Sequence, residues 1–173
     1  KVKAILTVNN TSAKTEKQDI YFSVYEKENP GKVILEKKLP RVALKQGTNV
    51  VTMELHCPEA RIWDLDTPYL YVCGVDVKSG KKLSDRAVQT FGFRWFEPVG
   101  IGKDAMLRLN GRRVMLRTAI SWGYWPATGL YATPEMAEKQ VSVAKSMGLN
   151  MLNFHRSIGS PVVLEKADEL GLL

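Results

Sequence analysis

Residues 20–25 carry the sequence Ile20-Tyr21-Phe22-Ser23-Val24-Tyr25, in which apolar side chains alternate with side chains that bear a polar group. Alternation with a period of two is typical of a strand with one buried face. Turn-forming clusters such as Asn29-Pro30-Gly31 separate this segment from further strand-like segments at 2–8, 33–35, 50–55, 69–77 and 87–93. Short strands at this spacing predict an antiparallel β-sandwich of two sheets over residues 1–98. We expect Trp63, Tyr69 and Tyr71 to fill its core.

The pattern changes after Pro98. Asn110-Gly111 lies between two apolar segments and predicts a hairpin, because both central positions of a type I′ turn need positive φ. Thr133-Pro134 predicts the start of a helix that ends at Gly148, with a strand over 149–154 and a second helix from Ser160 to Gly171. Within the first helix, residues fall at helical spacing at Met136, Gln140, Val143, Ala144 and Met147. This alternation predicts the beginning of a parallel α/β segment over residues 99–173.

Composition narrows the classes of function. The chain has 173 residues, of which 45% are hydrophobic and 25% charged, as in folded globular proteins. Its net charge of +7 is spread evenly rather than gathered in a patch, so we expect no nucleic-acid partner. Its apolar runs fall far short of the ~20 residues that span a bilayer, so we expect no membrane partner. Cys57, Cys73 and the two histidines show no ligand spacing, and no metal or cofactor is expected.

Five segments resemble glycoside hydrolase family two, the group of β-galactosidases, β-glucuronidases and β-mannosidases. In chain order they are Arg61–Tyr71, Phe91–Arg94, Leu109–Arg117, Met147–Asn150 and Ala167–Leu172. In that family an immunoglobulin-like domain precedes a (β/α)8 barrel. The resemblance therefore implies an all-β immunoglobulin-like sandwich (1–98) followed by an incomplete TIM-barrel segment (99–173), since a whole barrel needs ~250 residues. The first residue is lysine rather than methionine, and we expect a processed chain or a piece of a longer protein.

Active sites of such barrels lie at the carboxyl ends of the strands. The loops after the first two predicted barrel strands carry Trp122 and Trp125, then Asn153, His155 and Arg156. We expect these five residues to bind a carbohydrate substrate, because aromatic rings stack on pyranose rings while amide, imidazole and guanidinium groups bind hydroxyls. The alternatives are packing at the barrel rim for the tryptophans, a satisfied histidine and a solvated arginine.

The site segments also depart from the family pattern. Thr118 replaces a glycine, Asn153 occupies the place of an arginine, and His155 precedes Arg156 one place out of register. The segment Ser121-Trp122-Gly123-Tyr124-Trp125-Pro126 also differs from the familiar β-galactosidase version. These departures leave the substrate open.

No catalytic residue is expected in this chain. Retaining glycosidases need two carboxylates ~5–5.5 Å apart, and the resemblance implies that they lie on the fourth and seventh barrel strands. The acidic residues after Pro98 that attract attention fall instead on predicted helices outside the barrel: Glu135, Glu138, Glu165, Asp168 and Glu169. We therefore predict that the parent protein is a glycosidase and that this chain alone is inactive.

Two alternatives stay open at this point, a non-catalytic carbohydrate-binding module and a purely structural sandwich. An unfinished barrel is expected to expose strand edges and apolar surface, which favours self-association. A carbohydrate enzyme of this kind is compatible with a periplasmic or secreted location, but the sequence leaves localisation undecided.

Overall fold

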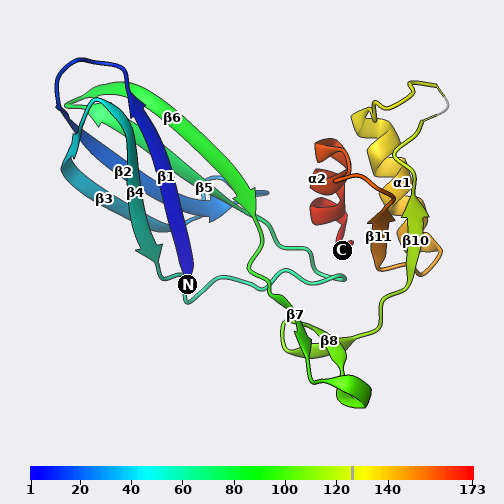
Figure 1. Cartoon of the computed structure of the whole chain (residues 1–173). Helices are drawn as coiled ribbons and strands as arrows, with labels where there is room; N and C mark the ends of the chain where they lie inside the picture. Colours follow the sequence, from blue (N-terminus) through cyan, green and yellow to red (C-terminus); the bar gives the residue numbers. More distant parts are fainter. Residues whose placement is uncertain (126) are drawn as a thin grey trace. The chain divides into compact units, whose positions relative to one another are not determined.

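The computed structural model describes residues 1–125 and 127–173 (Figure 1). Pro126, the last residue of the tryptophan-rich segment, lies outside the described residues. The chain forms two compact units. The first unit comprises Lys1–Ala60 and Tyr71–Phe91, and the second comprises Arg61–Leu70 and Gly92–Leu173. The division into domains 1–98 and 99–173 stays a prediction.

The first unit is a β-sandwich of two antiparallel sheets. One sheet pairs β1 (Val2–Asn10) with β4 (Gly47–Leu55). The other contains β3 (Val33–Leu44), β2 (Glu16–Glu26), β5 (Tyr71–Ser79) and β6 (Lys82–Phe91) in that order (Figure 1). All six strands predicted from alternation are confirmed, and so is the sandwich.

The core of the sandwich follows the alternation in the sequence. Ile20, Phe22 and Val24 are almost completely buried on β2, and Val75 and Val77 are buried on the adjacent strand β5. Full burial of such a side chain is worth about 1.5–3 kcal/mol. Tyr71 is also buried, as predicted. The opposite face of β2 therefore carries the side chains that the alternation left polar or aromatic.

The second unit begins with a three-stranded antiparallel sheet of β7 (Phe96–Val99), β8 (Met106–Leu109) and β9 (Arg112–Val114). A short 3₁₀ helix, Gly102–Asp104, connects the first two strands. The predicted hairpin is confirmed, with φ of 52° at Asn110 and 78° at Gly111. Strand β7 was not predicted, because a proline such as Pro98 usually interrupts a strand. Proline is tolerated here because β7 lies at the edge of the sheet.

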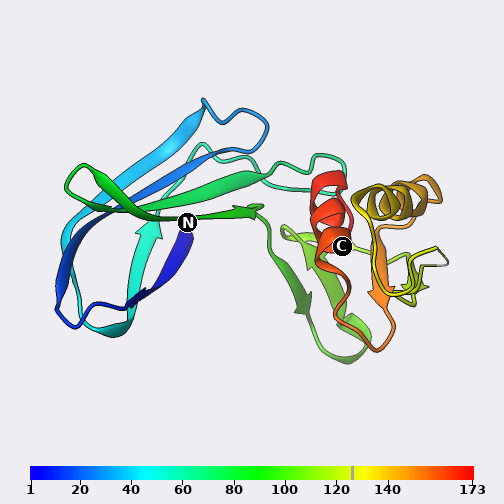
Figure 2. The same cartoon turned by 90° about the horizontal axis from the view of Figure 1, so that it is seen from above.

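A parallel α/β segment follows. Strand β10 (Thr118–Ser121) pairs in parallel with β11 (Met151–Phe154), and helix α1 (Pro134–Ser146) connects them. Helix α2 (Pro161–Leu170) packs with α1 beside β11 (Figure 2). The Oγ1 atom of Thr133 accepts a hydrogen bond from the backbone N–H of Met136, which confirms the predicted cap. Neither helix in the described part of the chain is long and apolar enough to cross a bilayer.

The residues at helical spacing that predicted α1 are not all buried. Val143 and Met147 are exposed, and the buried residues are Ala137, Val141 and Ala144. These side chains form a cluster with Val163 and Ala167 of α2 and with Leu152 and Leu172. Small side chains let the two helices approach closely, so packing selected alanines where a pattern search favours bulky residues.

Trp63 is buried as predicted but lies in the second unit, not in the sandwich core. Its indole Nε1–H donates to the carbonyl of Asp168 at 2.7 Å, and its backbone N–H donates to the carbonyl of Phe93 at 3.0 Å. Its own carbonyl accepts from Nδ2 of Asn110 at 2.8 Å. The Arg94 guanidinium lies 4.2 Å from the centre of the ring and also pairs with Asp168 at 2.7 Å. Trp63 thus joins three segments that are far apart in sequence.

The rest of the 61–70 loop is fixed to the same unit. Lys145 Nζ donates to the carbonyl of Leu65 at 2.6 Å and to that of Gly171 at 3.0 Å, and Arg112 pairs with Asp64. Tyr69 was expected in the core but is 37% exposed, with its hydroxyl accepting from Arg61 at 2.6 Å. The loop therefore contributes one buried ring and several polar contacts to the second unit.

We predict that Trp63→Ala lowers the free energy of unfolding of the second unit by about 3–5 kcal/mol, because it leaves a large cavity. Amide hydrogen exchange in α1 and α2 measures the effect. The control, Trp95→Ala, truncates a tryptophan that is 49% exposed and should cost less than about 1 kcal/mol. Equal protection of the helices in the two variants would contradict the prediction.

Candidate substrate-binding site

The candidate site lies where strands β10 and β11 end. In their parallel register Ser121 is opposite Phe154, so the residues that follow, Trp122 and His155, leave the sheet at the same edge. The backbone N–H of His155 donates to the carbonyl of Ser121 at 2.9 Å and extends this register by one residue. The carboxyl ends of parallel strands are where α/β proteins bind ligands.

Trp122 and His155 are in direct contact. Their ring centres are 4.2 Å apart, with 44° between the planes. The indole of Trp122 is 68% exposed, whereas His155 is half-buried. The imidazole therefore supports one side of an aromatic surface that solvent, or a sugar ring, can reach. The structure brings together these two of the five predicted site residues.

Ser121, the residue before Trp122, makes a hydrogen bond with helix α1. Ser121 is buried, and its Oγ accepts a hydrogen bond from Nε2 of Gln140 on α1 at 2.9 Å. The Oε1 atom of the same glutamine is buried and has no hydrogen-bond partner within residues 1–125 and 127–173. Sequence reasoning used Gln140 only as one of the residues at helical spacing in α1. The available signal was a polar amide in an otherwise apolar row, which is costly to bury without a partner.

Trp125 does not join the Trp122–His155 pair in a described contact. It is half-buried against the cluster of α1 and α2, and it forms a tight turn with Gly129. Its backbone N–H donates to the carbonyl of Gly129 at 2.6 Å, and its carbonyl accepts from the N–H of Gly129 at 2.7 Å. The packing alternative thus has a structural basis, while substrate contact by Trp125 stays a prediction.

Asn153 and Arg156 are exposed. Asn153 is paired in register with Ile120, and both side chains lie on the sheet face opposite to buried Leu152. Arg156 follows His155 and has φ of 52°, a conformation that is uncommon for a residue with a side chain. Their roles as hydrogen-bond partners of a substrate stay predictions.

The five acidic residues predicted on helices lie on α1 and α2. Glu138 and Glu169 both pair with Lys166, at 3.5 Å and 2.8 Å, and Asp168 pairs with Arg94. A hydrogen bond to its own backbone N–H in the first turn of α1 holds the pKa of Glu135 below its usual value. These carboxylates are engaged on helix surfaces. No group of three or more potential ligands among the described His, Cys, Asp and Glu residues could hold a metal ion.

Comparison with known proteins identifies the family. The model of the Glycosyl hydrolases family 2 matches residues 1–94. The chain belongs to glycosyl hydrolase family 2. It is 24% identical to a β-galactosidase of Bacteroides ovatus over 167 residues, which cover 96% of this chain and 19% of that relative. A β-galactosidase of Photobacterium profundum is 29% identical over 126 residues, or 72% of this chain and 12% of that relative.

Solved structures agree with this membership. A β-glucuronidase of Parabacteroides merdae superposes with a TM-score of 0.74 at 28% identity, over 91% of this chain and 19% of that chain. A family 2 member from Bacteroides cellulosilyticus has the same fold, with a TM-score of 0.86 at 23% identity over 99% of this chain and 21% of that one. This family 2 chain spans between 12% and 19% of the length of the curated relatives it matches.

We predict that Arg156→Gly stabilises this family 2 chain by about 0.5–1 kcal/mol, because glycine adopts positive φ without the steric cost of a Cβ. The melting temperature should rise by about 1–4 °C. Arg41→Gly is a second test in the sandwich. Because Arg41 has φ of 51°, the same rise is expected there. Arg156→Val should lower the melting temperature. A fall in both glycine variants would show that the backbone conformation at these positions is not strained.

Proposed function

We propose that this chain is part of a retaining glycosidase that hydrolyses β-linked sugars. The observation that carries the proposal is the exposed Trp122–His155 pair at the carboxyl ends of two parallel strands, in a chain that belongs to family 2. Further support comes from the Bacteroides ovatus β-galactosidase, whose similarity covers 96% of the chain and therefore includes the α/β segment. A stand-alone binding or structural module would not require that segment.

In this proposal β10 and β11 are the first two strands of a (β/α)8 barrel. The parallel register, the helix between the two strands and a second helix after them are the repeating unit of such a barrel. The face of the sheet with Ile120 and Asn153 would then point into the barrel, and α1 and α2 would lie outside. Trp122, His155 and Arg156 would lie in the loops at the catalytic end.

The chemistry requires two carboxylates from later strands. One attacks the anomeric carbon while the other protonates the leaving oxygen, and water then hydrolyses the glycosyl ester. The residues of this chain would bind and orient the sugar. The indole of Trp122 offers an apolar surface for a pyranose ring, and His155, Asn153 and Arg156 offer hydrogen bonds to its hydroxyls. β-Galactosides and β-glucuronides are the first substrates to test, given the names of the relatives.

We predict that the purified 173-residue chain releases no nitrophenol from nitrophenyl β-galactoside or β-glucuronide above a mock preparation, and that the protein encoded by its complete gene hydrolyses at least one of them. In that protein Trp122→Ala should lower kcat/KM by about tenfold or more, equivalent to ~1.4 kcal/mol of lost transition-state binding. Trp95→Ala is the control and should leave kcat/KM unchanged. Turnover by the 173-residue chain would contradict the proposal.

Self-association also stays a prediction. Within the described residues β10 and β11 form a sheet of two strands, and Ile120 on its face is 55% exposed. Unpaired strand edges and apolar side chains promote association. We expect the sedimentation coefficient of this chain to rise with concentration. The rise should be smaller for Ile120→Lys than for the control Val50→Lys, which alters an exposed side chain of β4. A monomer at every concentration would contradict the prediction.

A further inference from the structure

The outer face of the larger sandwich sheet contains a groove that the glycosidase site does not use. On this face Tyr21, Ser23 and Tyr25 of β2 lie opposite Asp76, Gly74 and Val72 of β5. The groove has a volume of about 550 Å³ and is lined by residues of all four strands of the sheet. This volume lies within the range of ~300–1,000 Å³ that is typical of small-molecule sites.

Gly74 lines the groove and is covered by neighbouring side chains. A Cβ at this position would lie 2.9 Å from Oγ of Ser23 and 3.7 Å from a ring carbon of Tyr25. Gly74 does not have positive φ, so its backbone conformation does not require glycine. Glycine inside a strand costs stability and often marks a place where another molecule approaches the backbone. Here the side chains of Ser23 and Tyr25 approach the backbone of Gly74.

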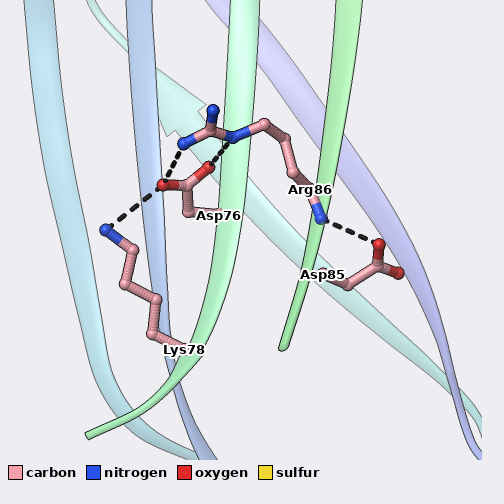
Figure 3. Close-up of polar contacts among 4 residues, drawn as sticks. All are labelled: Asp76, Lys78, Asp85 and Arg86. Carbon is pink, nitrogen blue, oxygen red and sulfur yellow. Dashed lines mark hydrogen bonds and ion pairs between the residues drawn. The ribbon is translucent and has the colours of Figure 1, made fainter. Parts of the chain in front are cut away.

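Asp76, Lys78 and Arg86 line the groove and form an ordered set of ion pairs (Figure 3). Arg86 binds Asp76 through both ends of its fork, with Nε at 2.6 Å from Oδ1 and Nη2 at 2.9 Å from Oδ2, and Lys78 lies 3.2 Å from Oδ2. The hydrogen bond from Arg86 is the main reason why the pKa of Asp76 is below its usual value. Because the one carboxylate of Asp76 pairs with two cations, these three side chains together carry a net positive charge.

Two lysines lie over the neighbouring ring of Tyr21. Nζ of Lys38 lies 4.9 Å and Nζ of Lys78 lies 4.7 Å from its centre, and Lys38 also pairs with Asp19 at 2.6 Å. Cations that are already fixed lose less conformational entropy when they bind a ligand. The lining as a whole contains four cationic side chains and two anionic ones, Glu36 and Asp76.

We propose that this groove binds an acidic oligosaccharide, a sugar chain that carries carboxylate or sulfate groups. The Tyr25 ring, which lines the groove, accepts the apolar face of a pyranose. Ser23 and Glu36 offer partners for its hydroxyls, and Arg86 and Lys78 attract its acidic group. The two carboxylates in the groove disfavour a continuous phosphate backbone. The inference rests on the proposed glycosidase function, for which the groove would hold the polymer that is being cut.

The test measures binding to the whole 173-residue chain by isothermal titration calorimetry. The probes are hexagalacturonate for carboxylate, a chondroitin sulfate hexasaccharide for sulfate, cellohexaose as the neutral sugar, and hexaglutamate as an acidic peptide. We expect saturable binding of at least one acidic sugar, weakened by salt, and at least about tenfold weaker binding of cellohexaose and hexaglutamate.

Three groove variants should each weaken this binding by about tenfold: Arg86→Ala, Tyr25→Ala and Gly74→Ala. The added methyl group of the last variant forces Ser23 to move, and so tests the shape of the groove without changing charge. Arg113→Ala and Tyr69→Ala are matched controls on exposed residues of the second unit and should bind like the wild type. Circular dichroism and the melting temperature check that each variant is folded.

Three outcomes would overturn the inference: no saturable binding of either acidic sugar up to about 10 mM, equally tight binding of hexaglutamate, or binding that survives the groove changes and is lost in Trp122→Ala. Each of them leaves the glycosidase proposal intact, because the catalytic test uses turnover by the complete protein. Conversely, a complete protein without glycosidase activity would not remove a groove that binds acidic sugars.

Discussion

Burial of Trp63 is the constraint on which the second unit depends. The chain leaves the sandwich after β4, inserts this one side chain between the 92–110 region and α2, and returns at Tyr71. The ring is completely buried, its indole N–H is satisfied, and its face is covered by Arg94. Buried aromatic rings with a satisfied polar group combine large apolar area with a fixed orientation. This one residue thus sets the position of the 61–70 loop relative to the α/β segment of its unit.

The segments that resemble family 2 in the sequence turn out to be neighbours around this ring. The first contributes Trp63, the second Gly92 and Arg94, the third Asn110 and the last Asp168. The remaining segment, Met147–Asn150, contributes Asn150. Its side-chain amide donates to the carbonyl of Met115 and accepts from the backbone N–H of Arg117. The motifs that reveal the family are therefore explained mainly by packing and hydrogen bonding within one unit. They identify the scaffold and not the substrate.

Features with a local physical cause were predictable from the sequence. Alternation located the six sandwich strands, Asn110-Gly111 located the hairpin, and Thr133-Pro134 located the start of α1. Features that depend on distant partners were not. Trp63 belongs to the second unit because of Asp168, more than 100 residues away, and α1 buries alanines because α2 packs on them. Likewise, Trp122 and His155 were predicted as site residues one by one, but their contact required the parallel register, and Gln140 became visible only through its bond to Ser121.

Two glycines let a side chain from another segment approach the backbone closely. Gly92 and Gly74 both lack positive φ, so in each case the absent side chain matters rather than the backbone conformation. At Gly92 the space is filled, because a Cβ would lie 2.8 Å from Cβ of Trp63. At Gly74, which is buried, a Cβ would lie 2.9 Å from Oγ of Ser23 and 3.7 Å from a ring carbon of Tyr25. A strand that gives up a side chain in its interior loses stability unless something else fills the space. In both places a neighbouring side chain fills it, Trp63 at Gly92 and Ser23 at Gly74, so each glycine lets a residue of another segment pack directly against the backbone.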